Sequence, residues 1–440
     1  MPLFDYPELA ITQIALIVIS IGWLFRRNDE IPLLISCFLF YVTSYRYWVV
    51  NTGLTKWVNA AGSISPEDAE KALACVVLGE ICLLVTYMFC QKQEIPVAVI
   101  SEGDRSLLIW LRPKAIFFGL VCLPLVIVTR SNVTDQVRAG KSLAFEVSGY
   151  LYLFPMVLIG IAALIILLWK FAGLTNLWTK IAAILILLGV ANLTFSPTSR
   201  FQFLGWVAAS GIILVSSYKP KKRLLILSIS TTIGLILFAV AGAMRNIDLA
   251  GDAVNQAALL RATSAEDANM LDGFVILQKV YPQQLDFRWG MEHLEVFLRP
   301  IPRAWWPEKP IGGGYSVLLG LSDVAKGTTV GFSPTLFGSF YAEAGIFGIV
   351  LLSLIYGSIL AAIVRYSTKI QIAVGVLVRA IVCACLIPLL RGGDLPGIYS
   401  WIGMAFWPCF LLLWLKRVEL KLKFTGLVTI NYDYARRYPN

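Results

Sequence analysis

The sequence predicts an all-α protein that crosses a membrane about eleven times and carries one large loop on the outer side. Three observations predict this fold class. Of the 440 residues, 58% are hydrophobic and only 15% are charged, whereas a soluble domain carries about 25% charged residues. The apolar residues gather in runs near the length of a membrane-crossing helix, about 20 residues. One long and more polar stretch, residues 245–335, separates the eighth run from the ninth.

Eleven apolar runs are the expected membrane helices. They are residues 9–25, 31–50, 72–90, 115–129, 149–169, 177–195, 201–218, 224–243, 336–364, 372–390 and 398–415. No Lys or Arg precedes the first run, so it does not resemble a secretory signal peptide. We interpret it as a span with its N-terminus outside. In the outward loop 51–70, Pro66, Glu67 and Asp68 predict the start of a helix. A second outward loop is expected at residues 130–148.

The distribution of basic residues predicts the orientation. Loops on one side of the eleven runs hold twenty Lys and Arg, and loops on the other side, without the long loop, hold seven. The richer side, which includes Lys219 and Arg223, is expected in the cytoplasm. The chain then divides into helices 1–8 (residues 1–244), a large extracytoplasmic loop (245–335), helices 9–11 (336–420) and a cytoplasmic tail (421–440). We expect the basic, aromatic tail to anchor at the membrane surface.

The sequence offers no signature of a metal or cofactor site. The eight cysteines lie in or beside apolar runs, which indicates packing rather than disulfides or metal binding. No GxGxxG motif follows a strand, and neither HExxH nor GxSxG occurs. We therefore expect no metal and no cofactor.

The second half of the long loop, residues 286–345, holds the features that indicate chemistry. It contains the only histidine, His293, and four prolines within residues 300–310. Prolines fix the backbone there and prevent a continuous helix. The same segment carries Arg303, Lys309, Trp305 and Trp306, which suit an anionic ligand with sugar faces. The tryptophans are equally consistent with an aromatic belt at the membrane interface.

Residues 291–299 predict a short helix that ends at Pro300. Glu292, Glu295 and Arg299 share one face, and apolar residues share the other. One interpretation is a salt-bridged helix that rests on the membrane. The other makes Glu292, His293 or Glu295 a general base, with His293 favoured by its titration range.

Arginines occur where the outward ends of separate spans are expected. Arg200 follows a hairpin, Arg245 follows the eighth span, and Arg391 links the last two spans. The planar guanidinium suits two-point binding of phosphate. Each one alone is equally consistent with a surface charge or an interfacial anchor. Together they predict an anion site at the outer surface.

Residues 301–310, IPRAWWPEKP, resemble the PR-x-x-W-P-x-K-P signature of the O-antigen or oligosaccharide repeat-unit polymerases of the Wzy type. Residues 331–335 (GFSPT) and 341–348 (YAEAGIFG) are similar to that family, as is Ser199-Arg200 after a span. The specific similarity covers roughly sixty residues. The chain departs from the pattern at Ser339, where an acidic residue is expected. In this chain the acidic residue of the segment is Glu343 instead.

The resemblance implies a glycosyltransferase of the bacterial inner membrane, with a helical fold related to the GT-C-like lipid-sugar transferases or the O-antigen ligases. Undecaprenyl-diphosphate-linked oligosaccharide would be both donor and acceptor, without nucleotide sugar or metal. The implied partners are the lipid bilayer, a chain-length regulator and a flippase, and no nucleic acid. The expected catalytic candidates are His293, Glu292 and Glu295. The expected substrate-binding residues are Arg200, Arg245, Arg299, Arg303, Trp305, Trp306, Lys309, Glu343 and Arg391.

Two alternatives stay open from the sequence. An O-antigen ligase, which moves a finished glycan to a lipid acceptor, would have a similar topology. A transporter or flippase of lipid-linked sugars would place ionisable residues along a path through the membrane. The ionisable residues within the spans are few, chiefly Arg46, Glu80 and Arg379.

Overall fold

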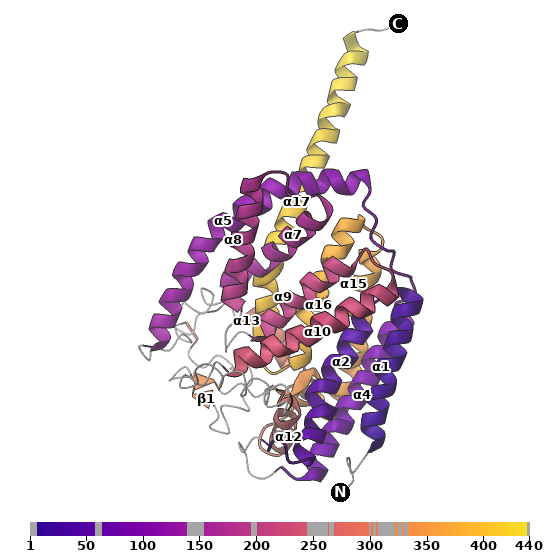
Figure 1. Cartoon of the computed structure of the whole chain (residues 1–440), viewed down its shortest axis with the longest axis vertical. Coiled ribbons are helices and arrows are strands. Elements are labelled where there is room, and N and C mark those ends of the chain that lie inside the picture. Colours follow the sequence, from indigo (N-terminus) through magenta and orange to yellow (C-terminus); the bar gives the residue numbers. More distant parts are fainter. Residues whose placement is uncertain are drawn as a thin grey trace.

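In the computed structural model the chain forms a bundle of long helices, from which the last helix projects (Figure 1). The structure describes residues 7–57, 64–138, 154–194, 200–243, 263, 268–298, 301, 305–306, 322–323, 328–329 and 333–437. Of these residues, the side chains of 129–138, 155, 200–202, 241–243, 322–323, 328–329 and 418–437 are outside the description.

Helices make up nearly all of the described chain. The helices before the long loop are α1 (Pro7–Arg27), α2 (Ile31–Phe40), the π-helix η1 (Tyr41–Tyr45), α3 (Arg46–Asn51), α4 (Pro66–Cys90), α5 (Glu102–Arg138), the 3₁₀ turn η3 (Phe154–Met156), α7 (Val157–Phe171), α8 (Leu177–Thr194), α9 (Arg200–Val215) and α10 (Pro220–Ala243). The later elements are α12 (Met270–Val280), α13 (Met291–Leu298), a two-residue antiparallel ladder of β1 (Ser322–Asp323) and β2 (Thr328–Thr329), α15 (Thr335–Ser367), α16 (Ile372–Arg391) and α17 (Leu395–Arg437).

The helices confirm a polytopic membrane protein. In the described part of the chain, 9 helices are long and apolar enough to cross a membrane. Two shorter apolar helices, Val157–Phe171 and Phe203–Val215, lie on two further apolar runs of the sequence. Each is shorter than the roughly 20 residues that a perpendicular span needs. The predicted helix start at Pro66 is also confirmed, since the Ser65 side chain accepts a hydrogen bond from Asp68 N.

Two elements are longer than the sequence predicted. Helix α5 continues to Arg138, so its last turns occupy the start of the expected loop 130–148. Figure 1 shows α5 crossing one end of the bundle before it turns down the side, and we attribute this bend to its internal prolines Pro113 and Pro124. Helix α17 continues through the expected tail to Arg437 and projects from the bundle (Figure 1). Polar residues extend both helices because nothing in these segments stops a helix that has already formed.

Small residues let the central helices approach closely. A Cβ added at Gly357 of α15 would lie 2.6 Å from the carbonyl oxygen of Leu83 in α4. One added at Gly205 of α9 would lie 2.7 Å from the carbonyl oxygen of Ala384 in α16. Small residues at helix interfaces allow this backbone contact in a membrane, where van der Waals packing drives association. The pairs α4–α15 and α9–α16 are therefore among the most closely packed helices of the bundle.

The long loop contains a core helix that its polar surroundings did not predict. Helix α12 is buried on nearly every side, and Phe274 and Leu277 belong to the main hydrophobic core. Arg46 at the start of α3 makes a two-point ion pair with Asp272 of α12, Nε–Oδ1 3.1 Å and Nη2–Oδ2 2.8 Å. This buried pair attaches the loop to the bundle.

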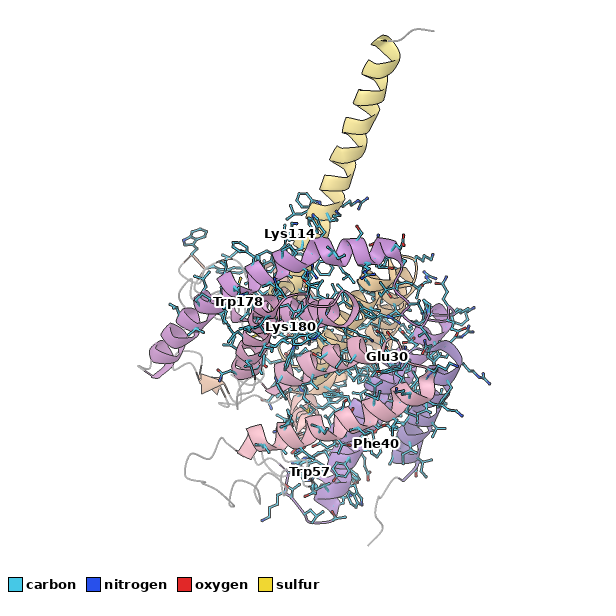
Figure 2. All side chains as sticks on the ribbon, turned by 45° about the horizontal axis from the view of Figure 1, so that its top comes forward. Glu30, Phe40, Trp57, Lys114, Trp178 and Lys180 are labelled. Carbon is cyan, nitrogen blue, oxygen red and sulfur yellow. The ribbon has the colours of Figure 1, made fainter. Side chains whose placement is uncertain are left out.

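The two ends of the bundle differ. Helix α12 and strand β1 lie at one end, and α17 projects from the other (Figure 1). Figure 2 shows Lys114 where α17 leaves the bundle and Trp57 at the opposite end. The large loop and the basic tail thus belong to opposite ends, as an odd number of crossings requires. Which end faces the cytoplasm remains a prediction from the basic residues.

Candidate functional site

The site begins at a break in helix α15. Ala344 (φ −159°, ψ 35°) and Gly345 (φ 62°, ψ −143°) leave helical geometry, so the carbonyl groups just before them lose their helical partners. The loop supplies new donors, because Arg288 N bonds to Ala342 O (3.0 Å) and Trp289 N bonds to Glu343 O (2.9 Å). Glycine suits the positive φ at position 345. The break therefore docks residues 288–289 against the membrane helix.

The carboxylate of Glu343 caps the N-terminus of helix α13. Glu292 N donates to Glu343 Oε1 (3.0 Å), and Gly290 N donates to Glu343 Oε2. A carboxylate is favourable at a helix N-terminus, where backbone N–H groups have no helical acceptor. Glu343 is buried, so these bonds hold it in a fixed orientation.

His293 lies between a carboxylate and a tyrosine. Its Nδ1 is 3.4 Å from Glu343 Oε1. This contact is within ion-pair distance but does not have hydrogen-bond geometry. Its Nε2 is 3.0 Å from the hydroxyl of Tyr356, which bonds in turn to the hydroxyl of Tyr399. The histidine side chain is 24% exposed, so a ligand can reach it. The polar chain Glu343–His293–Tyr356–Tyr399 joins α13, both parts of α15 and α17.

A second carboxyl, Glu292, lies beside this chain in a buried position. Its Oε1 accepts a hydrogen bond from Leu395 N (3.3 Å) at the start of α17. Burial raises the pKa of Glu292 to about 8, and Glu343 and Asp394 add to the rise while Arg288 opposes it. Glu292 is therefore mostly protonated at neutral pH and can donate as well as accept a hydrogen bond.

The remaining carboxyl of α13, Glu295, forms an ion pair with Arg288. Both glutamates of the helix point inward, whereas Met291, Leu294 and Phe297 are 44%, 55% and 76% exposed. The expected division into a charged and an apolar face is present, with the charged face turned to the protein. Because Glu295 already has a cationic partner, it is less suited than His293 to take a proton.

The structure places the other predicted residues as follows. Arg391 ends α16 and is followed by two glycines with positive φ, which bring the chain against Thr335 and then to α17. Trp305 is 82% exposed, and Trp306 is partly exposed. Arg200 begins α9, but its side chain is outside the described part. Arg245, Arg299, Arg303 and Lys309 also lie outside the described residues.

Four of the predicted residues thus meet in one cluster: Glu292, His293, Glu295 and Glu343. The predicted convergence of arginines on one anion site stays a prediction. Sequence reasoning missed Tyr356 and Tyr399, which complete the polar chain. The available signal was a phenol inside an apolar run, since a buried tyrosine hydroxyl needs a polar partner.

The arrangement is suited to proton transfer at a base that a carboxylate orients. Among the residues that the structure describes, no group of three or more His, Cys, Asp or Glu could hold a metal ion. Comparison with known protein families finds no match, and comparisons with curated proteins and with solved structures find no similar protein.

Proposed function

We propose that the chain is a glycosyltransferase that joins polyprenyl-diphosphate-linked oligosaccharide repeat units into a polysaccharide at the outer face of a bacterial inner membrane. The observation that carries this proposal is His293, held between Glu343 and Tyr356 and reachable from outside the protein. It supplies the general base that sugar transfer to a hydroxyl needs. The resemblance of residues 301–310 to repeat-unit polymerases supports the same reaction.

In the proposed reaction His293 takes the proton from a hydroxyl of the acceptor sugar, directly or through Tyr356. The hydroxyl oxygen forms a bond to the anomeric carbon of the donor. The bond from that carbon to the diphosphate oxygen breaks, and the lipid diphosphate leaves with the electron pair. Glu343 stabilises the imidazolium that forms, as a carboxylate does behind a catalytic histidine.

The leaving diphosphate needs positive charge rather than a proton. Arg391 and the arginines predicted at the outer surface, together with Lys309, would supply that charge without a metal. Trp305 and Trp306 would offer faces to the sugars. The reaction should accordingly proceed in the presence of a chelator.

The test is polymerisation by purified protein from lipid-linked repeat units, read as a ladder of products. His293→Ala should abolish the ladder, and Tyr356→Phe should reduce it, because the phenylalanine cannot bond to His293 Nε2. Tyr366→Phe is the matched control, since Tyr366 lies on the same helix and is exposed. A normal ladder from His293→Ala would contradict the proposal. Single transfer to a different lipid acceptor would instead indicate a ligase.

A second candidate function is transport of lipid-linked sugars. The observation that favours it is the burial of ionisable residues within the bundle, namely Arg46, Glu80 and Arg379. Such residues often mark a path through a membrane. Movement of a lipid-linked sugar across proteoliposomes, with no ladder, would support transport over polymerisation.

A further inference from the structure

A polar cluster lies inside the bundle, apart from the site around His293. Gln13 of α1 donates through Nε2 to Glu80 Oε2 on α4 (2.8 Å). Its own Oε1 accepts hydrogen bonds from Ser44 (2.5 Å) and Thr43 (3.3 Å) of the π-helix η1. All four side chains are buried. A carboxyl group therefore lies buried between three helical segments of the membrane bundle.

Glu80 lacks the cation that accompanies two other buried acids inside this bundle, Glu30 and Asp272. Glu30 pairs with Arg223 (2.7 Å), and Asp272 pairs with Arg46 (2.8 Å). For Glu80 no Lys or Arg partner occurs among the described residues, and its Oε1 is buried without a hydrogen bond. An ionised carboxylate buried in this way would be costly.

The charged groups on the helices around α4 either contact another charged or titratable group or lie in the terminal turns of their helix. On α12, Lys279 pairs with Asp68 (3.2 Å), while on α15 Glu343 faces His293. The charged residues of α1, Glu8, Arg26 and Arg27, lie in its first and last turns. The titratable group that the structure places beside Glu80 is the thiol of Cys37 on α2. None of these groups can neutralise the carboxylate.

A proton can complete the cluster. Ser36 of α2 lies beside the Glu80 carboxyl, and its Oγ is 3.3 Å from the Oγ of Ser20. A protonated Oε1 can donate to Ser36, which can donate to Ser20, so each buried polar atom gains a partner. An ionised carboxyl could instead accept a hydrogen bond from Ser36, but its charge would stay buried without a cation. We propose that Glu80, with Gln13 and Ser36, forms a proton-binding site within the membrane.

A cavity lies beside Cys37, the residue that follows Ser36 in α2. Cys37 lines a cavity of 340 Å³ between α1, α2, α9, α10 and α16. Glu30 also lines the cavity, and Tyr41, the first residue of the π-helix, does so as well. Single π-helical turns inside α-helices frequently mark functional sites. The cavity therefore reaches the turn of α2 that carries Ser36.

The test uses the full-length protein in membranes and dicyclohexylcarbodiimide, an apolar reagent for protonated carboxyls. The Glu80 oxygen would bond to the central carbon of the reagent, and the acid proton would move to its nitrogen, so the peptide gains the whole mass of the reagent. We expect this adduct on Glu80, with a yield that falls as the pH is raised from about 6 to about 9, where buried carboxyls titrate.

Glu80→Gln should abolish the adduct and keep the fold, because its neutral amide can donate to Ser36. Glu70→Gln is the matched control on the same helix and should leave the adduct on Glu80 unchanged. The infrared difference between the wild type and Glu80→Gln should contain a band of a protonated carboxyl, because Glu292 contributes the same band to both proteins. Absence of this difference band would overturn the proposal, as would unfolding of Glu80→Gln. Protection from the reagent by added sodium at fixed pH would also overturn it, in favour of a sodium site.

Discussion

Glu343 contacts three groups with one carboxyl: the backbone N–H groups of Gly290 and Glu292, and the ring of His293. It therefore begins α13 and orients the candidate base. A single side chain with both tasks links the folding of the loop to its chemistry.

The first prediction separates these two tasks. Glu343→Gln keeps the shape and one acceptor oxygen but removes the negative charge. Loss of the charge should lower the rate of polymerisation about a hundredfold, the lower end of what general acid–base catalysis contributes. The weaker start of α13 should lower stability by about 1 kcal/mol. Polymerisation assays and thermal unfolding measure the two effects, with exposed Glu94→Gln as control. An unchanged rate would exclude Glu343 from the reaction.

The second prediction concerns the pH dependence of stability. Because the pKa of Glu292 is raised to about 8, the folded protein binds a proton that the unfolded chain releases near its ordinary pKa of about 4.3. The folded state then binds more protons between these two values, so this group lowers stability as pH rises through that window. Glu292→Gln should remove this dependence. The stability of the variant relative to the wild type should therefore increase as the pH rises, up to about pH 8. The measurement is the free energy of unfolding of both proteins as a function of pH. A difference between them that stays the same at every pH would contradict the prediction.

At the scale of elements, α13 was predictable and α12 was not. Pro300 and the spacing of Glu292 and Glu295 predicted a helix over residues 291–299, and the structure describes α13 over Met291–Leu298. Helix α12 carries an equally apolar sequence, but its short length within a polar loop hid it. Only its packing against α4 and α15 shows that it belongs to the core. The break in α15 was also hidden, because a glycine inside an apolar run does not specify a positive φ.

The third prediction tests that break. Gly345→Ala places a Cβ at φ 62°, 3.2 Å from the ring of Phe287. The strained backbone should cost about 1 to 3 kcal/mol. It should also shift Glu343 relative to His293 and lower the activity. Gly22→Ala is the matched control, because its added Cβ would meet nothing within 4 Å. Equal behaviour of the two variants would show that the positive φ is unimportant.

At the scale of the whole molecule, hydropathy predicted the helices but not their assembly. The apolar runs identify which segments are helical, since each one must satisfy its own backbone groups in lipid. They do not reveal that Tyr356 and Tyr399 meet. That contact depends on the packing of α15 and α17, which are distant in sequence. Hence His293 and its neighbours were candidates from sequence, whereas their tyrosine partners required the structure.

The fourth prediction is the orientation. Trp305→Cys and Lys219→Cys, each made in a chain without native cysteines, place thiols in the large loop and in the basic loop before α10. An impermeant thiol reagent added to intact cells should label Trp305→Cys only, because the basic loop is expected in the cytoplasm. Labelling of Lys219→Cys alone would reverse the orientation.

The hydrogen bonds from Arg288 and Trp289 to the broken end of α15 have a consequence for cooperativity. They make part of the large loop a continuation of a membrane helix, so the two should open together as one unit. In hydrogen exchange measured by mass spectrometry, the amides of Arg288 and Trp289 should be as slow as those of residues 336–343. Gly345→Ala should accelerate both sets together. If the loop amides exchange quickly while α15 stays protected, the two segments unfold independently.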